Sequence, residues 1–309
     1  NLVSFNLFPR YPNASVVFGE LTGLQIVYND QGQVLIPGYN INTIGDINFL
    51  DGFYLFSDES ETISYQGTFI KPEDWDITVE PGKWNYISML DRNPVAITEV
   101  FAGFEDDISI VQEASGDSWI PSQGINTIGN MEPGLGYKIA LSGASPITFN
   151  YPATAKQPLA SNVQDSKALK STRQTSNFSY TETGLPYAVI VKLKQPAESQ
   201  FTLVPGNEIG LFDGNQCVGA AVYEGGDQLL IVAWQADEGQ NLPGFTPGHP
   251  IKAQVYRENF LNNTRHDLKK FTGGIPYFGE GNFNKVILEP VPTGEEPFEF
   301  DVQPNPFKD

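Results

Sequence analysis

One internal repeat constrains the fold of this chain more than any other feature of its sequence. The pentapeptide Ile-Asn-Thr-Ile-Gly occurs at residues 41–45 and again, 84 positions later, at residues 125–129. This period exceeds the roughly 20 to 50 residues of solenoid repeats, so the sequence predicts two copies of one module, each with its own small core. Further matches at the same offset need no gap from residue 24 onward: Leu24, Ile26 and Val27 match Ile108, Ile110 and Val111, Gly32 matches Gly116, Ile36-Pro37 matches Ile120-Pro121, and Gly52-Phe53 matches Gly136-Tyr137.

The matched positions have the composition of short strands joined by turns. Residues 24–28 and 108–112 are rich in β-branched and apolar side chains, as half-buried strands require. Gly32 and Gly116 lie in polar stretches that indicate hairpins. In the repeated pentapeptide, asparagine caps a turn with its side chain and glycine supplies a positive φ. The pentapeptide therefore favours a fold-determining turn over a catalytic motif.

The rest of the chain indicates an all-β protein. Only residues 14–21 and 95–101 resemble helical turns, and 30 glycines and 23 prolines divide the sequence into short runs. A later group of short apolar runs predicts a β-sandwich, with strands at Tyr187–Leu193, Glu208–Phe212, Cys217–Tyr223, Leu229–Trp234, Ile251–Arg257 and Lys285–Leu288. We expect two duplicated small β modules at 1–70 and 71–152, a polar basic linker at 153–178, a β-sandwich accessory domain at 179–292, and a final segment at 293–309 that contains a linker and one strand.

Charge and composition exclude several classes of function. The net charge of −19 argues against nucleic-acid binding, which needs a basic surface. No run approaches the roughly 18 apolar residues of a membrane-spanning helix. The single cysteine, Cys217, has no internal disulfide partner and lies in an apolar strand pattern, which favours a buried thiol. The two histidines, His249 and His266, belong to no recognisable motif.

No nucleophile, P-loop, dinucleotide or zinc motif is present, so the sequence predicts no catalytic residue, no cofactor site and no enzymatic activity. One oxygen-rich group, Glu208, Asp213 and Asn215, is a candidate Ca²⁺ site. Hairpin-turn chemistry explains the Asp-Gly-Asn sequence equally well. The acidic run at 105–107 lacks the spacing of a known calcium loop, and we interpret it as a solvated turn.

The tryptophans are the candidates for stacking on sugar rings. Trp84 and Trp234 lie in apolar strand patterns that favour core packing. Trp119 replaces Leu35 of the other copy, so it is either a core residue or a residue that stacks on a glycan.

The C-terminal residues resemble the opening of the C-terminal sorting domain of type IX secretion substrates. The resemblance is carried by Phe300–Phe307 and centres on Pro304, Asn305, Pro306 and Phe307, after a linker rich in Pro, Gly and Glu at 290–297. Only the first strand of that sorting domain is matched.

Two further stretches resemble accessory β-domains of large secreted proteins from bacteria with this system. Residues 206–221 are similar to the segment GDEIGVFDG-x-x-CVGA, with Asn207 in place of the usual Asp, which weakens the idea of a metal in this loop. Residues 84–88, together with the repeated pentapeptide and 134–137, resemble a second accessory module. The resemblance implies export by the type IX machinery and a place outside the cell, but no particular reaction.

From these features we expect a secreted or cell-surface segment with a structural, adhesive or spacer role, whose partners are the secretion machinery, other copies of itself, surface proteins or glycans. The alternative is a carbohydrate-binding accessory region of a secreted hydrolase whose catalytic domain lies upstream. Because nothing precedes Asn1 to match Trp84, and the sorting domain is matched only at its start, we expect a piece of a longer polypeptide.

Overall fold

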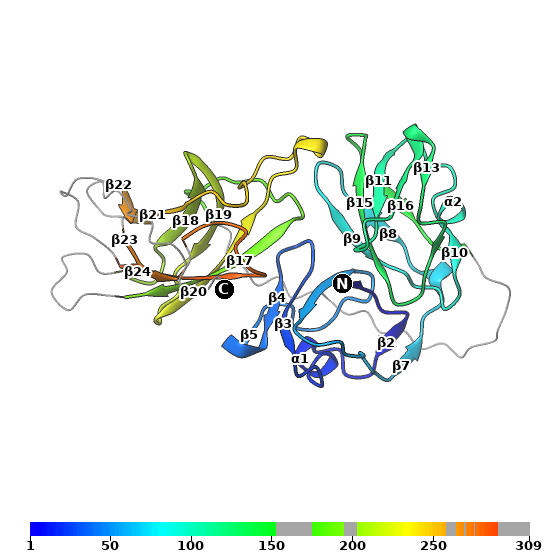
Figure 1. Ribbon diagram of the computed structural model, residues 1–309, viewed down its shortest axis with the longest axis horizontal. Helices are drawn as coiled ribbons and strands as arrows, with labels where there is room; N and C mark the ends of the chain where they lie inside the picture. Colours follow the sequence, from blue (N-terminus) through cyan, green and yellow to red (C-terminus); the bar gives the residue numbers. More distant parts are fainter. Residues whose placement is uncertain (153–174, 195–202, 258–263, 269, 275, 290–309) are drawn as a thin grey trace, which may run out of the picture.

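The computed structural model describes residues 1–152, 175–194, 203–257, 264–268, 270–274 and 276–289, and in these residues the protein is all-β (Figure 1). The helices are single turns. Most of the expected basic linker, at 153–174, lies outside the described residues, as does the sorting motif Pro304–Phe307.

The first copy forms a five-stranded antiparallel sheet in the order β1-β6-β3-β4-β5. A bulge interrupts the pairing of β3 with β6 between Leu24 and Ile26. The elements of this copy are β1 (Leu2–Val3), β2 (Leu7–Pro9), α1 (Ala14–Val17), β3 (Leu24–Tyr28), β4 (Val34–Ile36), η1 (Pro37–Tyr39), β5 (Ile41–Asn42), β6 (Phe53–Ser57) and β7 (Gly67–Phe69), of which β2 and β7 pair separately.

The second copy forms a sheet of the same order, β9-β15-β11-β12-β13, with a bulge at the matching place between Ile108 and Ile110. The repeat in the sequence is therefore a repeat of topology. Its elements are η2 (Pro72–Asp74), β8 (Ile77–Val79), β9 (Asn85–Ser88), β10 (Val95–Ala96), α2 (Ile97–Val100), β11 (Ile108–Gln112), β12 (Ser118–Ile120), η3 (Pro121–Gln123), β13 (Ile125–Asn126), β14 (Asn130–Met131), β15 (Gly136–Leu141) and β16 (Ile147–Phe149).

The repeated pentapeptide makes the same turn in both copies. The Asn42 side-chain oxygen accepts from Gly45 N at 2.9 Å, and the Asn126 oxygen accepts from Gly129 N at 2.8 Å. Both glycines have φ of 67°, a left-handed conformation that favours glycine. In both copies the threonine hydroxyl accepts a 2.8 Å bond from the amide nine residues before it. These bonds close the β4–β5 and β12–β13 hairpins, so the pentapeptide is a structural turn.

The two copies join each other reciprocally. Ser4 N donates to Gly134 O at 3.0 Å. At the matching positions of the other copy, Ser88 N donates to Leu50 O at 3.0 Å. Such an exchange of equivalent contacts is the pattern of a two-fold symmetric interface, here formed within one chain. The neighbouring bridges follow the same rule, since Val3 pairs with Leu135 and Ile87 pairs with Asp51.

This joint explains why glycine precedes the aromatic residue in both copies. A Cβ atom on Gly52 would lie 3.0 Å from Ile87 O, and one on Gly136 would lie 2.9 Å from Val3 O. Real Cβ contacts are rarely this close. The matched pair Gly52 and Gly136 therefore lets each copy bring its backbone against the other.

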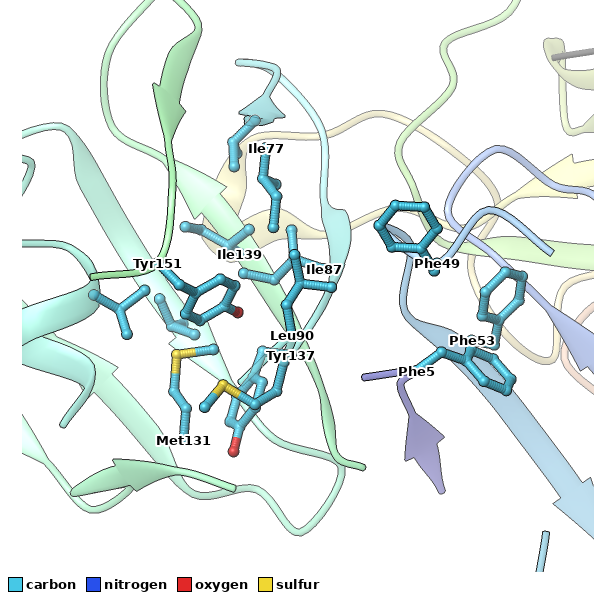
Figure 2. Close-up of a cluster of buried hydrophobic side chains, with 14 of the residues drawn as sticks. Phe5, Phe49, Phe53, Ile77, Ile87, Leu90, Met131, Tyr137, Ile139 and Tyr151 are labelled. Atoms are coloured by element: carbon cyan, nitrogen blue, oxygen red, sulfur yellow. The ribbon is translucent and has the colours of Figure 1, made fainter. Parts of the chain in front are cut away.

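The buried side chains of the two copies form one continuous cluster, whereas we expected a separate small core in each. Phe5 and Phe53 of the first copy belong to the same cluster as Ile87, Tyr137 and Tyr151 of the second, and Figure 2 shows the two groups of side chains on either side of the joint. The reciprocal hydrogen bonds between the copies bring the two sheets together, so that buried side chains of both copies belong to one cluster.

The third part of the chain is a sandwich of two four-stranded sheets, β20-β17-β24-β23 and β19-β18-β21-β22. All six predicted strands are present, and β22 and β23 were not predicted. The elements are β17 (Pro186–Leu193), β18 (Glu208–Asp213), β19 (Gln216–Val222), β20 (Gln228–Trp234), η4 (Glu238–Gln240), β21 (Ile251–Arg257), β22 (Thr264–Leu268), β23 (Lys270–Gly274) and β24 (Asn284–Glu289).

Strand β17 is buried on both faces because it joins the sandwich to the first copy. Val189 and Val191 point into the sandwich core, while Ala188 and Ile190 pack against Ile26 and other residues of the first sheet. This double burial accounts for the apolar run at 186–191 in β17, which is typical of a strand covered on two sides. Strand β24 pairs with it in parallel. In Figure 1 the first copy accordingly lies between the sandwich and the second copy.

Candidate functional site

A pocket of about 660 Å³ lies where the three sheet systems meet, and we call it the junction pocket. Its volume is within the range of about 300–1,000 Å³ that is typical of small-molecule sites. One wall comes from the two copies and the other from the segments that flank β17 and follow β20. The lining residues are Tyr28, Tyr54, Phe56, Trp84, Tyr86, Gln112 and Lys138 on the first wall, and Leu185, Pro186, Gln235, Ala236, Asp237, Glu238 and Gly239 on the second.

Aromatic rings form the first wall of the junction pocket. Tyr28 and Tyr54 are directly opposite each other on β3 and β6, and their ring centroids are 5.5 Å apart at 18°. Phe56 completes a triangle of nearly parallel rings, with its centroid 6.1 Å from that of Tyr54 and 6.2 Å from that of Tyr28. The three rings are partly exposed. Tyr86 of the second copy closes the group at 5.5 Å from Tyr54, edge to face.

Trp84 fixes the two walls of the junction pocket to each other. Its backbone N–H donates to Thr183 O at 2.8 Å, and its indole N–H donates to a carboxylate oxygen of Asp237 at 2.9 Å. The side chain is only 4 % exposed. Gly184 has φ of 74°, and a Cβ atom at this position would collide with the carbonyl of Trp84. A glycine is therefore required for the backbone of the second wall to approach the first.

Two of the three charged groups of the pocket, Lys138 and Asp237, contact Trp84. The Lys138 ammonium lies 4.7 Å from the centroid of the Trp84 ring, a cation–π contact. Burial lowers the pKa of Lys138, and the negative charge of Asp237 opposes that change. Asp237 also caps η4 by accepting from Gln240 N at 3.2 Å. Among the lining groups, Glu238 lies at the exposed rim.

The hydroxyl groups of Tyr28, Tyr54 and Tyr86 make no hydrogen bond to any other residue that the structure describes. Burial raises the pKa of all three phenols above their usual value. They therefore remain neutral and can both donate and accept. Tyr86 is 4 % exposed as a whole residue and lines the pocket, where water or a ligand can hydrogen-bond to its hydroxyl.

A buried polar network lies beside the junction pocket, between the two copies. Lys83 Nζ is 3.2 Å from a carboxylate oxygen of Asp30. Burial, followed by the nearby charge of Asp30, raises the pKa of Asp51 to about 8. Burial also raises the pKa of Asp30, which Lys83 lowers in part. The network is therefore a place where two carboxyl groups compete for one cation.

Trp119 is a core residue and does not stack on a glycan ring. It is 4 % exposed, and its ring stacks on Phe101 with centroids 5.7 Å apart at 16°. No face of the indole is left for a sugar. Trp84 is buried as well, but it lies at the wall of the junction pocket.

The three candidate calcium ligands do not come together. Glu208 and Asp213 stand at opposite ends of β18, and Asn215 is exposed in the hairpin that follows. The Glu208 carboxylate already accepts from Ser176 N, Ser176 Oγ and Asn177 N at 2.8–2.9 Å. These bonds hold the start of the sandwich segment, which is a structural role. Within the described residues no group of three or more His, Cys, Asp or Glu side chains could hold a metal ion.

Asp213 has a different partner, which the sequence did not reveal. It lies 2.9 Å from Nδ1 of His249 and accepts from Thr246 N at 2.9 Å. The imidazole is largely exposed, and these contacts hold the 246–249 loop against β18. Gly214, with φ of 58°, supplies the turn of the Asp-Gly-Asn hairpin.

Among the described residues no helix is long and apolar enough to cross a membrane. Comparison with known protein families, with curated proteins and with solved structures gave no match to this chain.

Proposed function

We propose that this chain is a secreted or cell-surface structural and adhesive module, acting as a spacer that carries a binding surface outside the cell, in a protein exported by the type IX machinery. The resemblance of residues 300–307 to a sorting domain, and of residues 206–221 to an accessory β-domain, supports export. Both rest on sequence motifs, and the first lies outside the described residues.

The observation that carries the structural part of the proposal is the joining of the sheets. The two copies exchange backbone hydrogen bonds at Ser4 and Ser88, and the sandwich packs its Ala188 and Ile190 on the first sheet. A chain of this construction holds its parts at fixed positions, as a spacer requires. The acidic surface expected from a net charge of −19 is suited to an exposed, soluble part of a protein.

Association with other copies is the further part of this proposal. The outer strands of the duplicated sheets, β5 and β13, are two residues long, and short edge strands are poor templates for strand addition. Strands β22 and β23 are longer, with five residues each. Association of copies by strand addition would therefore use the edge strands of the sandwich. Sedimentation velocity at increasing concentration tests this, because a monomer at all concentrations would remove self-assembly from the proposal.

The location is tested on intact source cells. Brief protease treatment, followed by mass spectrometry of the released peptides, should yield peptides from 1–152 and 175–289 without release of a cytoplasmic marker. Recovery of these peptides only after lysis would reject a place on the cell surface, and recovery from the culture medium would establish a secreted form.

A second function is favoured by the junction pocket. A carbohydrate-binding accessory region would need a concave site with aromatic rings and unpartnered hydroxyl groups, and Tyr28, Tyr54 and Tyr86 provide both. A spacer alone does not require such a site.

A further inference from the structure

We propose that the junction pocket binds a neutral carbohydrate, with the stacked rings of Tyr54 and Phe56 against the apolar face of a sugar and the tyrosine hydroxyls and glutamine amides on its hydroxyl groups. This inference deepens the second candidate function and rests on it for its biological setting. Binding itself depends only on the pocket.

The charges of the pocket select against anionic ligands, because Asp237 and Glu238 outnumber the one lysine of the lining. A cation would have to share the pocket with the Lys138 ammonium, which lies 4.7 Å from the centroid of the Trp84 ring, and Asp237 already accepts from the indole N–H at 2.9 Å. A neutral ligand meets no charge repulsion.

The remaining polar groups of the pocket suit a ligand with many hydroxyls. The side-chain amides of Gln112 and Gln235 make no hydrogen bond to another described residue, and neither do the three tyrosine hydroxyls. Amides and phenols can both donate and accept, as sugar hydroxyls do. They lie on opposite walls, because Gln112 belongs to β11 and Gln235 follows β20.

The aromatic side chains are positioned before any ligand arrives. Tyr28, Tyr54 and Phe56 hold one another as a triangle of nearly parallel rings, and the buried Tyr86 packs edge to face against Tyr54. The second wall is fixed by the two hydrogen bonds of Trp84. Preorganised groups lose little conformational entropy on binding, which matters for sugars because each of their contacts is weak.

The experiment uses the 309-residue chain on a printed array of neutral, acidic and amine-bearing glycans, followed by isothermal titration calorimetry with the neutral oligosaccharide that gives the strongest signal. Tetramethylammonium chloride serves as the cationic probe. The variants are Tyr54→Ala, Tyr54→Phe and Gln112→Ala, of which the last leaves the aromatic stack intact. Tyr11→Ala is the matched control, because Tyr11 is 63 % exposed and does not line the pocket.

We expect binding to neutral glycans that falls at least about tenfold in Tyr54→Ala and about two- to tenfold in Tyr54→Phe and Gln112→Ala, the range for one hydrogen bond. Tyr11→Ala should bind as the unaltered chain does. The proposal is overturned if no neutral glycan binds, if binding is insensitive to both Tyr54 and Gln112 in variants that melt normally, or if tetramethylammonium or acidic glycans bind instead. Because the assay uses purified protein, its result is independent of whether the chain is exported.

Discussion

The reciprocal joint between the copies contains a natural asymmetry that makes a sharp prediction. Ser4 and Ser88 occupy equivalent positions in the two copies, but only the Ser88 hydroxyl is hydrogen-bonded. It donates to Asp51 O at 2.7 Å and accepts from Phe5 N at 3.4 Å. The Ser4 hydroxyl is buried and has no hydrogen-bond partner among the described residues. The same substitution, serine to alanine, should therefore have different effects at the two sites.

The magnitudes follow from the hydrogen bonds that each substitution removes. Ser88→Ala leaves the part-buried carbonyl of Asp51 without this donor and the buried amide of Phe5 without its weak acceptor, so we expect the free energy of unfolding to fall by about 1–3 kcal/mol. Ser4→Ala removes a hydroxyl that was desolvated without compensation. Its effect should be neutral or stabilising by up to about 1 kcal/mol, since the methyl group of alanine fits the same space.

Urea denaturation of the two variants and the unaltered chain, with unchanged m values, measures the difference. We expect Ser88→Ala to be less stable than Ser4→Ala by at least about 1 kcal/mol. An equal loss of stability in both variants would mean that the two hydroxyls have equivalent hydrogen-bond partners. A larger loss for Ser4→Ala would mean that the Ser4 hydroxyl, and not that of Ser88, is the hydrogen-bonded one.

Three further substitutions test other parts of the account. Gly184→Ala should lower the free energy of unfolding by more than about 2 kcal/mol, because it adds a collision with the Trp84 carbonyl to the strain of a positive φ. In the control Gly206→Ala the φ is also positive but no atom lies near the new Cβ. An equal loss of stability for both variants in urea denaturation would refute the close approach of Gly184 to Trp84. Trp119→Ala should cost about 3–5 kcal/mol as a core truncation, and an unchanged thermal melting temperature would show that the indole is not buried. Asp51 has a folded pKa of about 8, raised by burial from 3.8, so its contribution to stability is fully present below about pH 4 and is lost as the pH rises through 8. Asp51→Asn should therefore flatten the decline in urea midpoint between pH 5.5 and 8.5, and an equally steep decline in the variant would exclude Asp51 as its source.

Local patterns were sufficient to predict many elements of this fold, although not β22 and β23. The matched strands, the two helical turns and all six predicted sandwich strands depend on apolar alternation and on turn residues within a few positions of one another. The pentapeptide turn was predictable for the same reason, since Asn42 and Gly45 bond to each other.

The joint and the junction pocket could not be predicted, because they depend on residues far apart in the chain. Trp84 was correctly predicted to be buried, although β9 begins one residue after it. Its indole partner Asp237 is 153 positions away. Tyr28 and Tyr54 alternate with core residues along β3 and β6. This pattern does not predict that the sheet face on which the tyrosines lie borders a pocket. Glu208 was predicted as a metal ligand from its residue type alone. Its carboxylate oxygens instead accept hydrogen bonds from Ser176 and Asn177, which are more than 30 positions away and could not be anticipated from the local sequence.

The two copies and the sandwich hold one another in place, so that the junction pocket exists without a ligand. Hydrogen–deuterium exchange of the free chain tests it at the connecting amides Ser4, Ser88 and Trp84. We predict that these amides exchange nearly as slowly as those of the central strands β3 and β11. Rapid exchange at Trp84 or at both serines, while β3 and β11 remain protected, would show that the parts separate in solution and would contradict the account.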